Sequence, residues 1–227
     1  MLGSLRKYDM MKALSRIASM VALLFLRQEW RELRAELKRV YQSYINDTSC
    51  RPTALAQQLL ISGEDHRFFR HGGIDPIAIF RAIWRGIVLG QPEGASTIEM
   101  QVVRVISGRF ERTIRRKLHE MALATLVVRT IPKEDLPGVY LRIGYFGWRM
   151  NGFKDACRRL DLSAEALTAV QTARLVARLK YPQPHATQSE RWDQINTRAQ
   201  HLLRLHSQHR CDHTYIGLEM ESCYETI

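Results

Sequence analysis

Apolar residues recur every three or four positions along most of this chain, which is the spacing of the buried face of an amphipathic helix. The alternation of apolar and polar residues that marks a strand is weak throughout. Asp75 and Pro76 form an N-cap followed by proline in the first turn, a common way to open a helix. The 227 residues are enough to bury one substantial core. We therefore predict an all-α fold with one main domain.

Capping residues, prolines and glycines place the boundaries of the expected helices. An N-terminal amphipathic helix is expected where Trp30, Leu33, Leu37 and Tyr44 recur. The helices expected after it cover about 53–61, 76–90, 97–106, 111–129, 135–143, 163–179 (capped by Ser163) and 190–209. The chain is accordingly divided into an N-terminal basic and apolar segment with its amphipathic helix (1–50), a main domain (51–210) and a C-terminal tail (211–227).

The charge balance points to an anionic partner. Lysine and arginine number 34 against 23 acids, for a net charge of +11. Such a surface attracts phosphates, whether on nucleic acid, lipid headgroups or a diphosphate substrate. Nucleic acid is disfavoured because no reader motif is present. The apolar run 17–26 follows several basic residues and, at ten residues, falls short of the roughly 20 that a membrane span needs; it suits an interfacial anchor.

The cysteines leave the redox compartment open. Cys50, Cys157, Cys211 and Cys223 show no C-x-x-C spacing. Cys211 and Cys223 are close enough in sequence to pair across the tail, but spacing alone does not assign connectivity. The stretch "HSQHRCDH" in the tail matches no standard metal module, so a solvated tail is the favoured interpretation there.

The stretch "EDHRFFRHGGID", residues 64–75, combines acids, aromatics, a histidine and two glycines. Glu64 among aromatic side chains is a candidate proton acceptor, and His71 could orient a neighbouring carboxylate. An ordinary surface loop anchored by its phenylalanines explains the same residues equally well.

Three further stretches carry candidate chemistry. In "EGASTIEMQVVRV", Ser96, Met100 and Arg104 share one helix face, and free N–H groups at the helix start suit phosphate. In "RTIRRKLHE", Arg116 and Lys117 lie one turn before Glu120 and surround it with positive charge. "VYLRIGYFGWRMNG" is rich in aromatics. Taken singly, a capped helix, a solvated ion-pair face and core packing are the more common explanations.

In this order, the four stretches resemble the peptidoglycan glycosyltransferase domain, glycosyltransferase family 51. That family carries E-D-x-x-F-x-x-H-x-G-x-D, G-G/A-S-T-I-T-Q-Q-x-x-K, R-K-x-x-E and K-x-x-I-L-E-x-Y-L-N-x-x-Y-F-G. The corresponding segments here are "EDHRFFRHGGID", "GASTIEMQVVR", "RKLHE" and "KEDLPGVYLRIGYFG". The resemblance covers about residues 60–184, and four blocks in order are far more specific than any one alone.

The resemblance implies a lysozyme-like main lobe with a small membrane-facing lobe, to which the helix 76–89 with Trp84 would belong. It implies that the chain polymerises lipid II. The 4-hydroxyl of the acceptor sugar would attack C1 of an undecaprenyl-diphosphate-linked glycan with inversion, releasing undecaprenyl diphosphate. The implied location is the periplasmic or outer face of the bacterial inner membrane. Because no penicillin-binding domain follows, a cross-linking transpeptidase would be a separate chain.

Site residues are carried over by position. Glu64 corresponds to the base that takes the hydroxyl proton, and Glu120 to the second essential carboxylate. The remaining substrate-binding positions are Asp65, Phe68, His71, Ser96, Thr97, Gln101, Arg104, Arg116 and Lys117. No cofactor is required by the resemblance, which allows a divalent cation, Mg²⁺ or Mn²⁺, near Glu120; no metal ligand is assigned.

Five positions depart from the family pattern. Glu99 replaces threonine, Met100 the first glutamine, Arg104 lysine, Gly138 glutamate and Arg142 asparagine. We interpret both Glu99 and Met100 as weakening the diphosphate site. The Glu99 carboxylate would repel the diphosphate, and the Met100 thioether cannot form a good hydrogen bond. The alternative function is therefore a divergent, non-catalytic member that serves as a membrane or cell-wall-assembly binding module. A lysozyme-like hydrolase also uses paired carboxylates, but the "GAST" block and a basic diphosphate face have no role in it.

Overall fold

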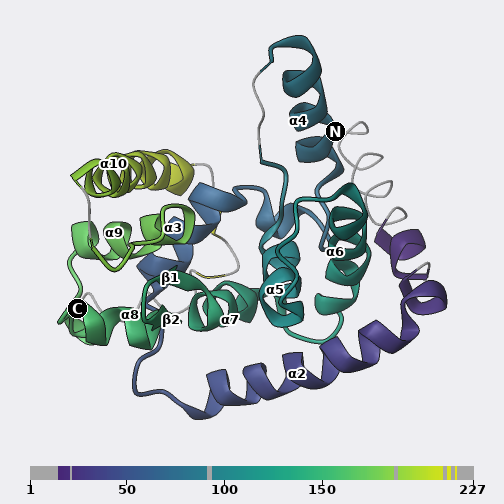
Figure 1. The fold of residues 1–227 in the computed structure, drawn as a ribbon, viewed down its shortest axis with the longest axis horizontal. Coiled ribbons are helices and arrows are strands. Elements are labelled where there is room, and N and C mark those ends of the chain that lie inside the picture. The colour runs from purple at the N-terminus through teal and green to yellow at the C-terminus, as the bar shows by residue number, and fades with distance from the viewer. Residues whose placement is uncertain are drawn as a thin grey trace. The chain divides into compact units, whose positions relative to one another are not determined.

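A computed structural model describes residues 15–20, 22–90, 94–186, 189–211, 214–215 and 218 of the chain. These residues are mostly helical, with one two-stranded sheet, in agreement with the predicted all-α, lysozyme-like class (Figure 1). The chain divides into two compact units, described separately below. Unit 1 comprises residues 1–39 and 67–133, and unit 2 comprises residues 40–66 and 134–227.

The N-terminal amphipathic helix is confirmed as α2 (Arg27–Asn46). Its apolar stripe is buried, with Trp30, Leu33, Leu37 and Tyr44 all less than a tenth exposed. Ahead of it, residues 15–20 and 22–25 are also helical. Within the described parts of the chain, no helix combines the length and apolar character that a membrane span needs.

Unit 1 is built around two helices, α5 (Ile98–Ser107) and α6 (Ile114–Val127), which pack against each other. A short 3₁₀ helix, η1 (Phe68–Arg70), precedes them. The first residue of η1, Phe68, is fully buried. Gly73 (φ +96°) passes so close to α6 that a Cβ would lie 2.6 Å from the carbonyl oxygen of Ala124. Glycine is therefore needed at this point of the first sequence block.

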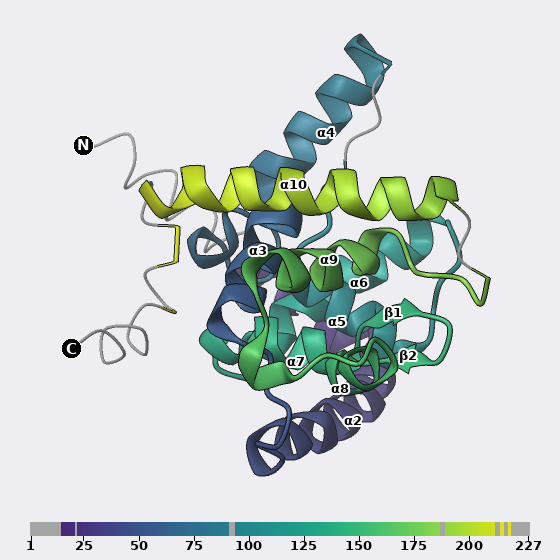
Figure 2. The same ribbon diagram turned by 90° about the vertical axis from the view of Figure 1, so that its left-hand side faces the viewer.

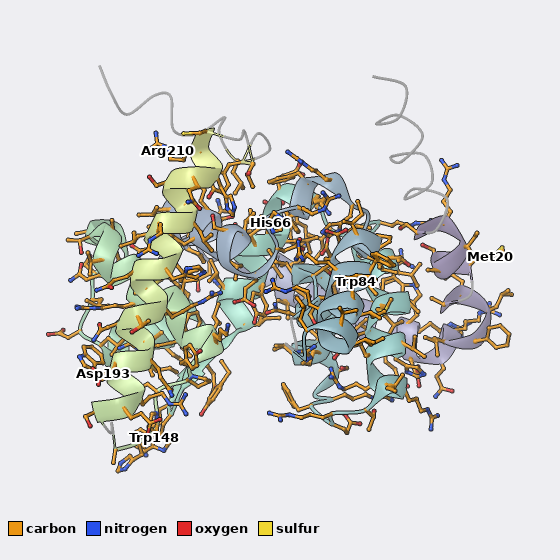
Figure 3. The ribbon with its side chains drawn as sticks, turned by 90° about the horizontal axis from the view of Figure 1, so that it is seen from above. Met20, His66, Trp84, Trp148, Asp193 and Arg210 are labelled. Atoms are coloured by element: carbon orange, nitrogen blue, oxygen red, sulfur yellow. The ribbon has the colours of Figure 1, made fainter. Side chains whose placement is uncertain are left out.

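Helix α4 (Pro76–Val88) also belongs to unit 1, and it extends away from α5 and α6 (Figures 1 and 2). Asp75 caps it as predicted, its Oδ1 accepting from the backbone N–H groups of Ile77 and Ala78. No residue of α4 is buried. Trp84, labelled in Figure 3, is 57% exposed. The other large exposed apolar residues of this segment are Ile77, Phe80, Ile83, Ile87, Val88 and Leu89.

In unit 2, α3 (Ala54–Glu64), α9 (Ala169–Lys180) and α10 (Ser189–Cys211) pack together, and α10 runs across the other two (Figure 2). Helix α7 (Leu136–Ile143) packs on both α3 and α8 (Phe153–Arg159). The 3₁₀ helix η2 (Lys133–Asp135) precedes α7, and η3 (Ala164–Ala166) follows α8. These contacts form the apolar core of unit 2.

A hairpin follows α7. Strand β1 (Tyr145–Gly147) pairs antiparallel with β2 (Met150–Asn151), with Tyr145 opposite Asn151 and Gly147 opposite Met150. The aromatics of this block are divided between core and surface, since Tyr140 and Phe146 are buried, Trp148 is half-buried and Tyr145 is 51% exposed. Core packing, the more common explanation of these aromatics, therefore accounts for two of the four.

Several helix boundaries differ from the prediction, and one predicted cap is wrong. The expected helix 163–179 begins only at Ala169, and residues 164–166 form η3 instead. Thr168 outcompetes Ser163 as the cap because it forms a capping box, in which it and Gln171 bond to each other's backbone N–H groups. Helix α6 starts three residues later than expected, after Thr113, α3 continues to Glu64, and α8 was not predicted.

Candidate active site

Glu120 lies at the centre of the best-defined polar cluster of unit 1. Its carboxylate is only 2% exposed and faces α5 from α6. The guanidinium of Arg104 binds it with two bonds, Nε to Oε1 and Nη2 to Oε2, each 2.9 Å long. Arg116, one turn before Glu120, donates from Nη1 to the same Oε1. Two cations around one anion leave a net positive charge, which suits a phosphate group.

The "GAST" block meets this cluster through Ser96. Its Oγ accepts from Arg104 Nη2 at 3.5 Å, so the predicted Ser96–Arg104 face exists. Thr97, not Ser96, caps α5, because Thr97 Oγ1 accepts from the backbone N–H of Met100. The same hydroxyl donates to the carbonyl of Gly73 at 2.8 Å, which ties the first and second sequence blocks together within unit 1.

Met100 lies on α5 between Thr97 and Arg104, and its side chain is fully buried in the core. A glutamine at this position would therefore need buried hydrogen-bond partners. The interpretation that Met100 weakens the site stays a prediction. Of the two remaining predicted positions here, Gln101 on α5 and Lys117 on α6 are both half-buried.

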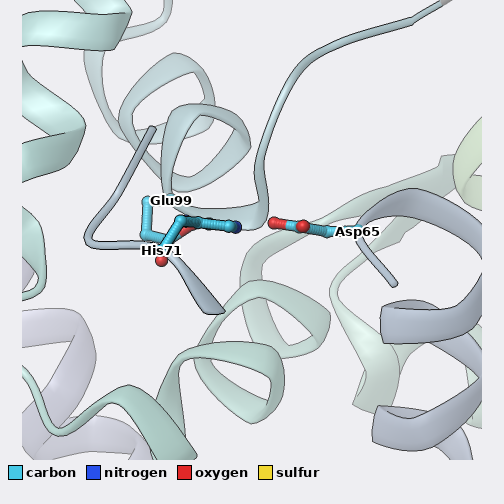
Figure 4. Close-up of side chains that lie close together, drawn as sticks. All are labelled: Asp65, His71 and Glu99. Atoms are coloured by element: carbon cyan, nitrogen blue, oxygen red, sulfur yellow. The ribbon is translucent and has the colours of Figure 1, made fainter. Parts of the chain in front are cut away.

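Glu99, which is fully buried, forms a second polar cluster in unit 1. Its Oε1 accepts from Lys133 Nζ at 2.8 Å, and the same ammonium donates to the carbonyl oxygen of His71 at 2.6 Å. The Lys133 ammonium also lies 4.3 Å from the ring centre of Phe68. Figure 4 shows the His71 and Glu99 side chains close together. Glu99 is thus held by internal cations, and it cannot act as an exposed charge that repels a substrate.

Opposing effects act on the ionisation of Glu99. Burial disfavours its charged form, but the Lys133 ammonium and the His71 imidazole together hold the pKa of Glu99 below its ordinary value. Its second oxygen, Oε2, has no hydrogen-bond partner among the described residues. The carboxylate therefore depends on Lys133 for its stability, and the first, second and fourth sequence blocks meet at this pair.

Arginine, histidine and glutamate line a cavity beside Glu120, all within unit 1. Helix α2 contributes Glu29, Glu32 and Glu36, and the facing side includes Arg109, Arg116 and His119. Glu29 bridges the two sides, with Oε1 3.5 Å from Arg109 Nη2 and Oε2 3.3 Å from His119 Nδ1. Leu33, Val103, Ile106 and Leu123 complete the lining, so the Glu120 cluster borders a cavity with both charged and apolar walls.

Unit 2 carries the other predicted carboxylates. Glu64 is the last residue of α3, and its side chain is a quarter exposed. Arg198 of α10 donates from Nη2 to Glu64 Oε1 at 3.1 Å and to the carbonyl of Gly63 at 2.7 Å. Asp65 follows as the C-cap of α3 and is buried. Arg198 therefore fixes the orientation of the predicted base, a contact that no sequence motif indicated.

The residues around Glu120 show what a divalent cation would meet. Both carboxylate oxygens already accept from guanidinium groups, so a metal ion at Glu120 would have to displace one of them. Two adjacent arginines also oppose a further positive charge. A cation requirement stays a prediction, and the cluster by itself favours an anion.

Together, the helical fold and the clustered blocks define a domain with a carboxylate held between arginines and a second carboxylate at a helix end. The transglycosylase family model matches residues 31–206. The chain belongs to the transglycosylase family.

Three similar proteins are consistent with the transglycosylase family. Penicillin-binding protein 1A of Escherichia coli (strain K12) is 39% identical over 93 residues, covering 40% of this chain and 11% of that protein. A Cupriavidus necator protein, named as a candidate transglycosylase, is 34% identical over 128 residues, covering 54% of each. Penicillin-binding protein 1A of Neisseria gonorrhoeae is 33% identical over 125 residues, covering 54% of this chain and 16% of that protein. The chain thus spans about half the length of one of these relatives and a small part of the others.

Proposed function

We propose that this protein is a peptidoglycan glycosyltransferase that polymerises lipid II and releases undecaprenyl diphosphate. The observation that carries the proposal is the Arg104–Glu120–Arg116 cluster. A departing diphosphate develops negative charge, and fixed guanidinium groups stabilise that charge without having to reorganise. Glu120 holds the two arginines in place and keeps their charges from repelling each other.

Glu64 is the proposed general base. An alcohol nucleophile needs a positioned group to take its proton as it attacks. The Arg198 bond to Glu64 Oε1 restrains the rotation of the side chain, which supports its role as a positioned base. The reaction would join the acceptor 4-hydroxyl oxygen to C1 of the donor sugar with inversion, as the diphosphate leaves from C1.

The test is a polymerisation assay with purified full-length protein and labelled lipid II. Glu64→Gln keeps the shape of the side chain and removes its basicity, so the initial rate should fall by about a hundredfold or more. Glu165→Gln, an exposed acid of η3, is the matched control and should polymerise at the normal rate. Normal polymerisation by Glu64→Gln would refute the assignment of the base.

The non-catalytic alternative rests on one observation, the ion pair of Glu64 with Arg198. The ion pair gives Glu64 a structural role, and a binding module would tolerate that arrangement because it needs no general base. Such a module would bind lipid II without forming glycan chains. Absence of product from the wild type, together with lipid II binding, would decide for the module.

We further propose that α4 contacts the bacterial inner membrane at its periplasmic or outer face. Its exposed aromatic and aliphatic side chains alternate with Arg81 and Arg85, the composition of an interfacial helix. Flotation with anionic vesicles at low salt tests this. Phe80→Ser with Trp84→Ser should release the protein from the vesicles, and binding that is unchanged by the pair would argue against α4.

A separate transpeptidase is the proposed protein partner. Several relatives are named penicillin-binding protein 1A and are much longer than the region that matches this chain. Glycan strands need cross-linking after they are polymerised, so an enzyme that polymerises them would act alongside a cross-linking enzyme. Co-purification of such an enzyme from detergent-solubilised membranes, lost at high salt, is the expected result.

A further inference from the structure

Two cysteines of unit 2 lie close together. Cys50 lies in the turn that follows α2, and Cys157 lies on α8. Each cysteine affects the ionisation of the other, and both are present as free thiols. Cys157 is buried at 3% exposure, whereas Cys50 is only partly covered. One thiol is thus reachable from solvent, and the other lies directly behind it.

The turn that carries Cys50 is fastened to the helices beneath it. Asp47 Oδ2 accepts from Arg142 Nη2 of α7 at 2.9 Å and from Lys154 Nζ of α8 at 3.3 Å. Lys154 also donates to Ser49 Oγ at 3.1 Å. Lys154 and Cys157 are three residues apart and share one face of α8. The Ser49–Lys154 bond and the Cys50–Cys157 pair therefore lie next to each other between the turn and α8.

We propose that Cys50 and Cys157 form a reversible disulfide when the chain meets an oxidising thiol–disulfide pool. This modification site is independent of the proposed glycosyltransferase activity. Each cysteine loses one proton and one electron, and the electrons reduce a small-molecule disulfide to two thiols. The bonds broken are the two S–H bonds and the S–S bond of the oxidant, and the bond finally formed joins the two protein sulfurs.

The environments of the two sulfurs set the order of the steps. Burial raises the pKa of Cys50 above its ordinary value, while Cys157 and the positive charges of Lys154 and Arg142 act against that rise. Cys50 is also the thiol that solvent can reach. Burial raises the pKa of Cys157 to about 12, so this thiol is a poor first nucleophile. Cys50 thus attacks the oxidant and releases one thiol. Cys157, which lies behind Cys50, then attacks the mixed disulfide on Cys50 and displaces the second thiol of the oxidant.

The disulfide would close a loop from residue 50 to residue 157, which restricts the unfolded chain and stabilises the folded one. A rise in the thermal midpoint of about 10 °C is expected on oxidation. The same link would hold the Asp47 turn against α8 even when acid or salt weakens its ion pairs. Nothing in this expectation depends on lipid II or on catalysis.

The experiment uses the full chain with Cys211→Ser and Cys223→Ser, so that only Cys50 and Cys157 remain. It is equilibrated with oxidised and reduced glutathione, alkylated, digested without reduction and analysed by mass spectrometry. The expected product is a peptide pair linked through Cys50 and Cys157, with a higher thermal midpoint that dithiothreitol reverses. Cys50→Ser, in the partly exposed turn, is the control and should show neither change.

Two results would overturn the proposal. One is recovery of both cysteines as alkylated thiols after incubation with excess oxidised glutathione. The other is a stable glutathione adduct on Cys50 with Cys157 still reduced. Both are measured on protein with intact Cys50 and Cys157, so the proposal stays testable even if a substitution at buried Cys157 prevents folding.

Discussion

Tyr44 of α2 occupies the space that a side chain at position 138 of α7 would need. A Cβ built on Gly138 would lie 2.7 Å from Cζ and 2.8 Å from Cε2 of the buried Tyr44 ring. Gly138 stands where the glycosyltransferase pattern has glutamate. The departure is thus coupled to Tyr44 through packing, and it does more than delete a carboxylate.

Gly138→Ala should therefore destabilise the protein, although glycine to alanine in a helix ordinarily stabilises by up to about 1 kcal/mol. We expect a loss of about 1–3 kcal/mol from overpacking, measured by urea unfolding. Gly86→Ala in α4 is the matched control, because nothing lies within 4 Å of the added Cβ, and it should not lose stability. A stabilising Gly138→Ala would show that the Tyr44 ring moves aside freely.

Glu99 and Lys133 should behave as a coupled buried pair. Glu99→Thr, which restores the family residue, leaves the Lys133 ammonium without its carboxylate and should cost about 3 kcal/mol. The double variant Glu99→Thr with Lys133→Met should be more stable than Glu99→Thr alone. Thermal unfolding of the wild type, Glu99→Thr, Lys133→Met and the double variant measures this coupling, and additive effects would contradict it.

Met100→Gln should lower stability without raising the polymerisation rate. The side chain is fully buried in an apolar environment, so an amide placed there costs about 1–3 kcal/mol unless it finds partners. Met100→Leu conserves volume and should cost less than about 1.5 kcal/mol. A faster Met100→Gln enzyme of normal stability would support the interpretation that Met100 weakens the diphosphate site.

Arg104 should be replaceable by neither alanine nor lysine without loss. Arg104→Ala should reduce the initial polymerisation rate at least tenfold, about 1.4 kcal/mol in the activation free energy. Arg104→Lys keeps the charge but cannot form both hydrogen bonds to Glu120, so its rate should lie between those of Arg104→Ala and the wild type. Arg158→Ala, at an exposed position of α8, should leave the rate unchanged. Equal rates for Arg104→Lys and wild type would show that charge alone suffices.

Tyr41 should make the protein lose stability in alkali. Burial first, and then its hydrogen bond to Asp135 Oδ2 (2.7 Å), raise the pKa of Tyr41 to about 12. The neutral hydroxyl is thus favoured by folding. Its contribution is fully present below about pH 10, the pKa of an unfolded tyrosine, and is lost between pH 10 and 12. Tyr41→Phe should flatten this part of the stability–pH curve, and an unchanged slope would contradict the assignment.

The helical class, most helix positions and the four family blocks follow from local sequence patterns alone. Helical spacing and capping are local properties, so Thr53, Asp75 and Thr97 could be read as caps without knowing what they pack against. The pairing of Arg116 with Glu120 was likewise readable, because residues four apart on a helix are neighbours. Where the local rule had competitors, as with Ser163 and Thr168, the capping box decided.

The structural roles of the residues that depart from the family pattern depend on tertiary contacts. Glu99 gains Lys133, Arg142 gains Asp47, and Gly138 makes room for Tyr44. Each partner is 34 to 95 residues away in the chain, and no periodicity carries information over that separation. The same holds for Arg198 and Glu64, 134 residues apart. Burial and the meeting of distant helices, rather than local spacing, turned positions that looked like losses into contacts that hold the fold.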